Sequence, residues 1–324
     1  MSLPVVILLY VVLATMVVMF SIKLADYVDL IDKKSNLSGA FIGGVVLAAV
    51  TSLPELFTSV SSVVFLKKPD LVIGNILGSN LFNECILAFL MVIWGRAFAK
   101  SVVGKSHTKT TLFTVFLFIM MFLAIFLGID FSLLNISIYT VIILVTYAVS
   151  IKAMAGDTAE NNEECTSSLT MKQIIVRFII MAVLLVTASI LVTFVTDELA
   201  AKLNLGATVA GALFLGIATS LPELTSSITL AKKGNFNATV GNIIGSGMFN
   251  FTIMALADIL HRGGSIYDSD SSKMLVLFGT VATVLVTATL LLKNKSKESE
   301  KPAMIYRLLG LAILACYVLF IVLS

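Results

Sequence analysis

Long apolar stretches separated by short charged joints constrain this chain more than any other feature of its sequence. About 20 apolar residues are needed to span the roughly 30 Å hydrocarbon core of a bilayer. The mean hydropathy is +1.04 and only 13% of the residues are charged, far outside the range of soluble globular domains. We therefore expect an all-α polytopic protein of a cell membrane. Ten transmembrane helices are predicted, at residues 3–24, 39–66, 71–94, 110–127, 132–154, 173–197, 206–231, 238–260, 273–293 and 304–323.

The basic residues are distributed unevenly between the joints. Most Lys and Arg residues lie in joints on one side of the predicted membrane, and positively charged joints stay in the cytoplasm. Both termini are therefore predicted to be extracytoplasmic, and the acidic joint 155–172 to be a cytoplasmic linker. This distribution accounts for the basic residues, so no nucleic-acid partner is expected, and no obligate protein partner is evident. The first span lacks a positive n-region and a cleavage site, so we expect an anchor helix.

The two halves of the sequence contain the same pair of motifs. Residues 43–59 read GGVVLAAVTSLPELFTS and residues 211–227 read GALFLGIATSLPELTSS; downstream, GNILGSNLFN at 74–83 matches GNIIGSGMFN at 241–250. An internal duplication explains two ordered matches better than a shared small-residue composition does.

Each half would hold five spans. Because five is odd, the second half must enter the membrane inverted relative to the first, which is typical of secondary transporters. The predicted organisation is a first five-helix repeat at 1–154, whose motif-bearing region is 39–94, and a second at 173–324, whose motif-bearing region is 206–260.

Each TSLPE motif places a glutamate near the bilayer midplane. The span 39–66 has its centre beside Ser52, and the span 206–231 has its centre beside Thr219. An ionised carboxylate at that depth costs several kcal/mol unless it is paired or faces a cavity. No Lys, Arg or His lies in the central parts of the predicted spans, so the expected partner of Glu55 and Glu223 is a mobile cation.

Pro54 and Pro222 favour a break in each of these spans. Proline disfavours a continuous helix, and Ser-x-x-Glu is the pattern of a capping box at a new helix start. We expect two half-helices in each span, whose freed carbonyls, hydroxyls and carboxylate are hard oxygen ligands suited to Na⁺ and Ca²⁺. A kink whose glutamate only caps its own helix is the alternative. The hydroxyls concerned are those of Thr51, Ser52, Thr219 and Ser220.

The second motif places two carboxamides at the same depth. Asn83 and Asn250 lie near the centres of their spans, and a spacing of four residues puts Ser79 and Ser246 on the same helix faces. We expect these four side chains to coordinate ions, while the glycines of the motif allow close helix packing.

Other acidic residues have less specific interpretations. Glu84 has Phe251 as its counterpart, and it is interpreted either as an accessory residue of the ion path or as a carboxylate hydrogen-bonded to another helix. The remaining acidic residues at span ends and in joints are expected to be solvated. They include Asp26, Asp29, Asp32, Asp130, Asp197, Glu198, Asp258, Asp268 and Asp270.

These motifs resemble those of the sodium/calcium exchanger family, part of the Ca²⁺/cation antiporter superfamily, whose α-repeats contain G-T-S-x-P-E and G-N-x-x-G-S. The resemblance implies that Glu55 and Glu223 are the Ca²⁺ carboxylates, assisted by main-chain oxygens of Thr51 and Thr219. It implies weaker roles for the carbonyls of Ala48 and Gly216. The Na⁺ sites would be completed by Ser52, Ser79, Ser220 and Ser246.

The chain departs from the family pattern in two respects. Val50 and Ala218 stand where the family usually has glycine before Thr-Ser. The family often has an aspartate at one of the positions of Asn83 and Asn250, so here the two glutamates are the only first-rank charges. Two carboxylates neutralise one Ca²⁺ or two protons, whereas three Na⁺ leave one positive charge over.

The predicted function is therefore exchange of Ca²⁺ for Na⁺ by alternating access, with these ions as substrates and no prosthetic group. Protons are expected to compete for two close carboxylates in a dry site, so Ca²⁺/H⁺ exchange remains an alternative. A cation channel is disfavoured because channels usually build selectivity from rings around a symmetric pore. An enzyme is disfavoured because the sequence contains no HExxH or Gly-x-Ser-x-Gly motif.

Overall fold

The computed structural model describes residues 2–35, 37–65, 67, 69–133, 136–156, 167–203, 219–261, 264–267, 272–295 and 302–323. Within them, eight helices are long and apolar enough to cross a membrane, and a pair bent by 43°, Gly39–Thr51 and Leu53–Val64, is long and apolar enough when its two helices are taken together. The chain is therefore a helical multi-pass membrane protein. The eight helices are α1 (Leu3–Lys34), α5 (Asp70–Ile93), α7 (Lys105–Leu127), α8 (Ile138–Ala155), α9 (Met171–Lys202), α12 (Phe236–Leu260), α13 (Lys273–Lys295) and α14 (Ala303–Leu323).

The predicted spans correspond to these elements with two qualifications. Of the span predicted at 206–231, helix α11 (Leu221–Lys232) provides the second part, while residues 206–218 lie outside the described residues. The helix predicted from residue 132 was wrong at its start, because β1 (Ser132–Leu133) pairs antiparallel with β2 (Ile136–Ser137). Helix α8 begins only after Ser137, whose hydroxyl accepts a hydrogen bond from the Tyr139 N–H as an N-cap.

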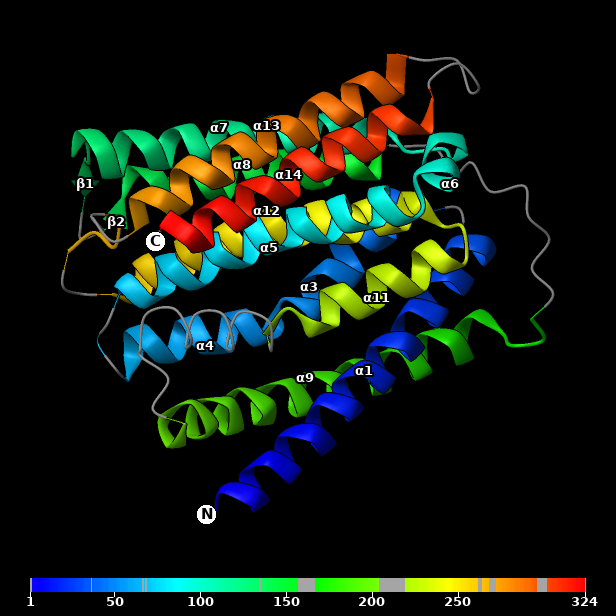
Figure 1. Cartoon of the computed structure of the whole chain (residues 1–324), viewed down its shortest axis with the longest axis horizontal. Helices are drawn as coiled ribbons and strands as arrows, with labels where there is room; N and C mark the ends of the chain where they lie inside the picture. The colour runs from blue at the N-terminus through cyan, green and yellow to red at the C-terminus, as the bar shows by residue number, and fades with distance from the viewer. Residues whose placement is uncertain are drawn as a thin grey trace.

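The helices are arranged around a central antiparallel pair, α5 and α12, which contact each other and run in opposite directions across the molecule (Figure 1). Of the most apolar 18-residue stretch of each of these two helices, 72% is buried, whereas 17% is buried in the corresponding stretch of α1. Helices α7, α8, α13 and α14 cover one side of the pair. On the other side α4 (Leu53–Val64) and α11 lie against the pair, and α1 and α9 contact each other beyond them (Figure 1).

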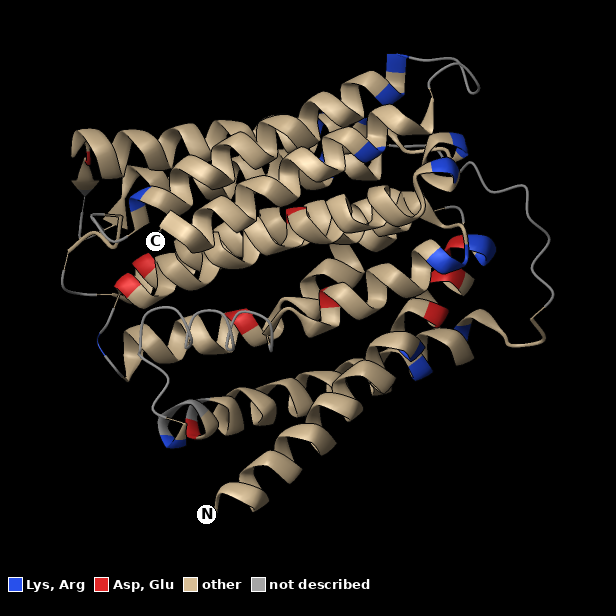
Figure 2. Ribbon diagram, in the orientation of Figure 1, with Lys and Arg blue, Asp and Glu red and all other residues tan. Residues whose placement is uncertain are grey.

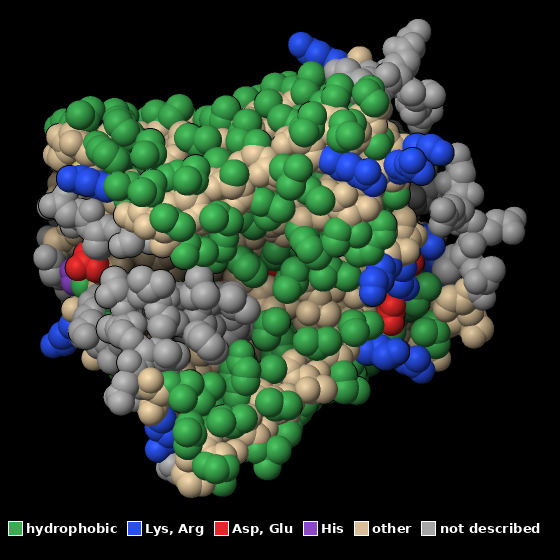
Figure 3. All heavy atoms as spheres, in the orientation of Figure 1, with side chains coloured by type: hydrophobic (Ala, Val, Ile, Leu, Met, Phe, Trp, Pro, Cys, Tyr) green, Lys and Arg blue, Asp and Glu red, His purple; other side chains and the backbone are tan. Residues whose placement is uncertain are grey.

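The surface is divided into an apolar belt and charged ends. In the face shown by Figure 3, hydrophobic side chains cover the lateral surface and charged side chains gather toward its two edges. Figure 2 shows that Lys and Arg concentrate at the end where α1 and α11 finish, while the N- and C-termini marked in Figure 1 lie toward the opposite end. An apolar belt between polar ends is the surface expected of a protein in a bilayer.

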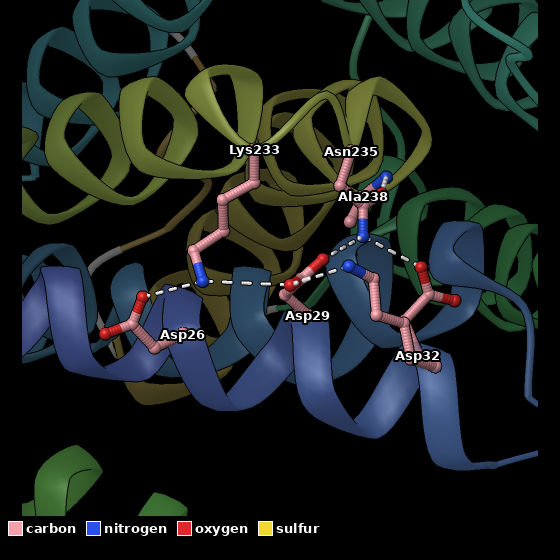
Figure 4. A network of polar contacts seen from close by, with 7 residues as sticks. Asp26, Asp29, Asp32, Lys233, Asn235 and Ala238 are labelled. Atoms are coloured by element: carbon pink, nitrogen blue, oxygen red, sulfur yellow. Dashed lines mark hydrogen bonds and ion pairs between the residues drawn. The ribbon is translucent and has the colours of Figure 1, made fainter. Parts of the chain in front are cut away.

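Two aspartates of α1 were wrongly expected to be solvated. Asp29 and Asp32 are buried, and the Asn235 Nδ2 donates to Asp29 Oδ1 over 3.2 Å and to Asp32 Oδ2 over 2.8 Å (Figure 4). Lys233 Nζ lies 2.9 Å from Asp26 Oδ1 and 3.7 Å from Asp29 Oδ2. These contacts connect the last turns of α1 to the turn between α11 and α12. They replace the hydration that the Asp29 and Asp32 carboxylates lose on burial.

Asp258, near the end of α12, was likewise expected to be solvated and is fully buried. Its Oδ2 accepts from the Ser137 N–H over 2.9 Å and from Thr140 Oγ1 over 2.6 Å, and its Oδ1 accepts from the Ile266 N–H over 3.3 Å. The carboxylate thereby satisfies backbone donors at the start of α8 and in the segment after α12, which is a structural role.

Candidate functional site

The first TSLPE motif interrupts its span at Ser52, as predicted. Helix α3 (Ala48–Thr51) ends there and α4 begins at Leu53, with Pro54 in its first turn. Ser52 has φ −89° and ψ 7°, and its counterpart Ser220 has φ −91° and ψ 8° immediately before α11. Both serines thus adopt the sparsely populated bridge conformation, which is frequent in functional sites. The residues preceding Thr219 lie outside the described part of the chain, so the second break is seen only from its C-terminal side.

The capping box expected at each break is wrong. Neither Ser52 nor Ser220 makes a side-chain cap hydrogen bond to its own helix. Instead, Ser52 Oγ donates to Glu223 Oε1 over 3.1 Å, and Ser220 Oγ donates to Glu55 Oε1 over 3.3 Å. The two motif copies therefore exchange contacts: each serine donates to the glutamate of the other copy, and hydrogen bonds to a carboxylate are stronger than those between neutral groups.

Threonines and serines around this exchange extend it into a buried cluster. Ser79 Oγ donates to Glu55 Oε1 over 3.4 Å, and Thr51 Oγ1 lies 3.4 Å from Ser246 Oγ. Thr219 is within hydrogen-bonding reach of Glu55, as Thr51 is of Glu223. The structure therefore groups eight of the ten predicted site residues into two sets of side-chain contacts, one containing Glu223 and the other Glu55, and each set takes residues from both copies. The eight residues are Thr51, Ser52, Glu55, Ser79, Thr219, Ser220, Glu223 and Ser246, and all are buried.

The two carboxamides lie on the central helix pair and have different contacts. Asn250 Nδ2 donates to Asn80 Oδ1 over 2.9 Å, and Asn80 Nδ2 donates to the Gly247 carbonyl over 3.3 Å. Asn83 is buried on α5, and its Oδ1 has no hydrogen-bond partner among the described residues. The structure therefore does not connect Asn83 to the cluster through that oxygen.

Four buried oxygens at repeat-related positions have no hydrogen-bond partner within the described chain. They are Glu55 Oε2, Glu223 Oε2, Asn83 Oδ1 and Asn250 Oδ1. Burying an acceptor without a donor costs about 1–3 kcal/mol, and more for a charged group. Over the described residues, neither glutamate has a Lys, Arg or His as ion-pair partner, so the arrangement has the chemistry of a cation site.

Sequence reasoning missed the asparagines that hold the two motifs together. Asn75 Nδ2 donates to Ser59 Oγ over 3.2 Å, and Asn242 Nδ2 donates to Ser227 Oγ over 3.0 Å at the corresponding positions. These bonds fix α5 against α4 and α12 against α11. The signal was present, because Asn75 precedes Ser79 by four residues and so shares its helix face.

The close packing expected from the motif glycines is found in the second copy. A Cβ placed on Gly245 of α12 would lie 2.0 Å from the Gly44 carbonyl oxygen, so only glycine permits this approach. Gly44 belongs to η1 (Ile42–Leu47), a π-helical segment before α3. Such segments are frequent near functional sites.

Comparison with known proteins identifies the family of this chain. A sequence model of the family described as sodium/calcium exchanger protein matches residues 5–154 and 173–324, which is nearly the whole chain. The chain belongs to the sodium/calcium exchanger protein family. Membership makes it a membrane transporter.

Individual known proteins also align over most of the chain. The uncharacterized membrane protein MJ0091 of Methanocaldococcus jannaschii is 29% identical over 287 residues, covering 88% of this chain and 87% of its own length. The putative antiporter CaxA of Alkalimonas amylolytica is 25% identical over 297 residues, covering 89% and 88%. The solved structure of the sodium-calcium exchanger NCX_Mj soaked with Na⁺ and Sr²⁺ matches with a TM-score of 0.75 and 22% identity over 99% of both chains, which shows a common fold.

Proposed function

We propose that this protein is a secondary antiporter that exchanges Ca²⁺ for Na⁺, with the ions bound between the two motif copies. The observation that carries the proposal is the set of four buried acceptors without partners: Glu55 Oε2, Glu223 Oε2, Asn83 Oδ1 and Asn250 Oδ1. Carboxylate and amide oxygens are ligands that Ca²⁺ favours. Membership of the exchanger family and the likeness to NCX_Mj, which is named a sodium-calcium exchanger, support the same substrates.

The charge of the site explains why the protein would exchange ions and would not let one ion cross alone. One Ca²⁺ between Glu55 and Glu223 leaves no net charge, and several Na⁺ coordinated by the carboxylates, the surrounding hydroxyls and the amide oxygens replace it. When no ion is bound, the two carboxylates are uncompensated, and reorienting such a site within a low-dielectric region has a high free-energy cost. Reorientation is therefore coupled to occupancy. Because serines of one copy bind the glutamate of the other, a movement between the copies changes both halves of the site together.

The proposed architecture has ten helices in two inverted five-helix repeats, 1–154 and 173–324, joined by the linker 155–172. Its support is the opposite direction of α5 and α12 together with the repeated motifs (Figure 1). We propose that the lysine-rich end faces the cytoplasm and that both termini are extracytoplasmic (Figure 2). The ions are substrates, no prosthetic group takes part, and the protein is a transporter and not an enzyme.

The proposal is tested by uptake of ⁴⁵Ca²⁺ into proteoliposomes that contain the purified protein. The vesicles are loaded with Na⁺, or given a pH gradient without Na⁺, and the wild type is compared with Glu55→Gln and Glu223→Gln. Glu198→Gln serves as the matched control, because Glu198 lies at the end of α9 beside Lys202, away from the cluster. We expect uptake driven by outward Na⁺ in the wild type and the control, and its loss in both site variants.

Each other result has a definite meaning. Uptake driven only by the pH gradient would replace Na⁺ by H⁺ as the counter-ion, which the two-carboxylate charge also permits. Uptake that equilibrates Ca²⁺ but never concentrates it would indicate a channel. Absence of uptake under both gradients, with correctly folded protein, would overturn the assignment of Ca²⁺.

A further inference from the structure

A small cavity lies beside the central cluster, where α5 meets three other helices; most of its wall is apolar, and a few polar groups face into it. Its volume is about 20 Å³, enough for one atom-sized ligand such as a water molecule or a bare alkali cation. Helices α5, α7, α12 and α13 form its walls, so it includes two helices that carry neither motif. Its polar lining consists of Asn80, Asn83, Glu84, Thr111, Thr114 and Thr283.

Glu84 gives this cavity a carboxylate with unused capacity. The side chain is buried, its Oε1 accepts a hydrogen bond from Thr283 Oγ1, and its Oε2 has no partner among the described residues. The sequence left two interpretations of Glu84, an accessory residue of the ion path or a carboxylate hydrogen-bonded to another helix. The hydrogen bond to another helix is observed, but it uses only one of the two carboxylate oxygens. Asn83 Oδ1, the neighbouring amide oxygen on the same cavity wall, also lacks a partner there.

The hydroxyls of the cavity offer lone pairs and not hydrogens. Thr111 Oγ1 donates its single hydrogen to the Thr108 carbonyl over 3.0 Å, and Thr114 Oγ1 donates to the Thr110 carbonyl over 3.0 Å. Thr283 Oγ1 is likewise 2.8 Å from the carbonyl of Gly279, one turn earlier on its own helix. A hydroxyl whose hydrogen is engaged can only accept or coordinate. These three hydroxyls therefore favour a cation over an anion as their ligand.

The amide of Asn80 does not reverse this preference. Its Nδ2 is engaged by the Gly247 carbonyl, and its Oδ1 accepts from Asn250 Nδ2. Two acceptors without partners, one of them on a carboxylate, favour a bound cation in the interior of a membrane protein, and the cavity volume admits one ion without a hydration shell.

We propose that this cavity binds one Na⁺, coordinated by Glu84 Oε2, Asn83 Oδ1 and threonine hydroxyls. The proposal deepens the proposed function, on which it rests for the identity of the ion. Glu84 then contributes a third negative charge beside the two motif glutamates. Only one such site exists in the described chain, because the counterpart of Glu84 is Phe251, which packs edge-to-face on Phe118 with ring centroids 5.4 Å apart.

The test is equilibrium binding of ²²Na⁺ to the purified full-length protein, counted per molecule. We compare the wild type with Glu84→Gln, Thr114→Val and Thr287→Val. Thr287 is the matched control: it is a buried threonine of α13 whose hydroxyl donates to the Thr283 carbonyl, and it does not line the cavity. We expect Glu84→Gln to bind one Na⁺ fewer than the wild type. Thr114→Val should raise the Na⁺ concentration needed to fill the last site by roughly three- to tenfold, and Thr287→Val should match the wild type.

The outcomes are separable from those of the proposed function. Equal Na⁺ counts and equal concentration dependence in the wild type and Glu84→Gln would overturn the site, as expected if the cavity held only water. If Glu84→Gln does not fold, an unchanged Na⁺ dependence in Thr114→Val would overturn it instead. Binding of ⁴⁵Ca²⁺ to the wild type without Na⁺ is measured in parallel, and its absence would reject the proposed Ca²⁺ site while leaving the Na⁺ counts interpretable.

Discussion

The two motif copies are alike where they face each other and different where they face other helices. Ser52 and Ser220 share one backbone conformation and exchange hydrogen bonds with the glutamates of the opposite copy. In contrast, α5 carries Glu84 where α12 carries Phe251, and these residues contact α13 and α7 respectively. The two copies are therefore equivalent at the centre that they share, and they differ where each one packs against its own neighbouring helices.

Removing one glutamate at a time tests most strongly whether the two motif copies contribute equally. Glu55→Gln and Glu223→Gln should each weaken Ca²⁺ binding by roughly 100-fold or more, because each removes half of the charge that faces the ion. The two losses should agree within about threefold, since the glutamates have equivalent surroundings. Equilibrium binding of ⁴⁵Ca²⁺ to purified protein measures both. A variant that kept wild-type affinity would show that the copies do not contribute equally.

The hydrogen bonds that Ser52 and Ser220 donate to the glutamates of the opposite copy give a second test of whether the two copies are equivalent. Ser52→Ala and Ser220→Ala each remove a hydroxyl that donates to a carboxylate, and such bonds are worth about 2 kcal/mol, or roughly 30-fold in affinity. We expect similar decreases in Ca²⁺ affinity and little change in helix content by circular dichroism, because neither serine caps its helix. Ser61→Ala, a partly exposed serine later in α4, is the control. A loss of helix content in the site variants would instead support the capping role.

The sequence predicted the centre of this molecule better than its periphery. Identical motifs, each with a proline and a glutamate predicted near the midplane, sufficed to predict the break at Ser52 and to group it with Ser79 and Glu223. The hydrogen-bond partners of Ser52 and Ser79 in the described chain all belong to one of the two repeated motifs. The partner of each serine could not be predicted, since a capping box and an exchange between copies use the same residues. The burial of Asp258 was not predicted for a different reason: two of its donors, the Ser137 N–H and the Thr140 hydroxyl, are more than 100 residues away and belong to no repeated pattern.

The start of α12 has a side-chain cap and the start of α5 does not. Removing the α12 cap should affect stability, by less than the site substitutions affect Ca²⁺ binding. Asn235 caps α12 and binds Asp29 and Asp32 of α1, whereas α5 begins after Pro69 without a side-chain cap hydrogen bond. Asn235→Ala should therefore lower the free energy of unfolding by about 1.5 kcal/mol through loss of the cap and of the bonds to the carboxylates. Thermal unfolding in detergent measures the change.

The control for the α12 cap is Lys233→Met, which removes only the ion pairs with α1. Lys233 and Asp26 are partly exposed, at 34% and 30% of their side-chain surface, and such pairs contribute about 0–1 kcal/mol. An effect of Lys233→Met as large as that of Asn235→Ala would mean that charge pairing, and not the asparagine, holds α1 against the turn before α12.

The smallest expected effect concerns the asparagine that only the first copy possesses. Asn80 occupies the position of Gly247 and bonds both to the Gly247 carbonyl and to Asn250. Asn80→Ala removes two hydrogen bonds, and because bonds between membrane helices average about 0.6 kcal/mol each, it should cost about 1 kcal/mol of stability. Asn75→Ala, which removes the single bond to Ser59 at a partly exposed position, should cost about half of that in the same thermal unfolding assay. The reverse order would show that the contacts repeated in both copies stabilise the helix pair more than the asymmetric one does, and that Asn80 serves mainly to orient the Asn250 amide toward the ions.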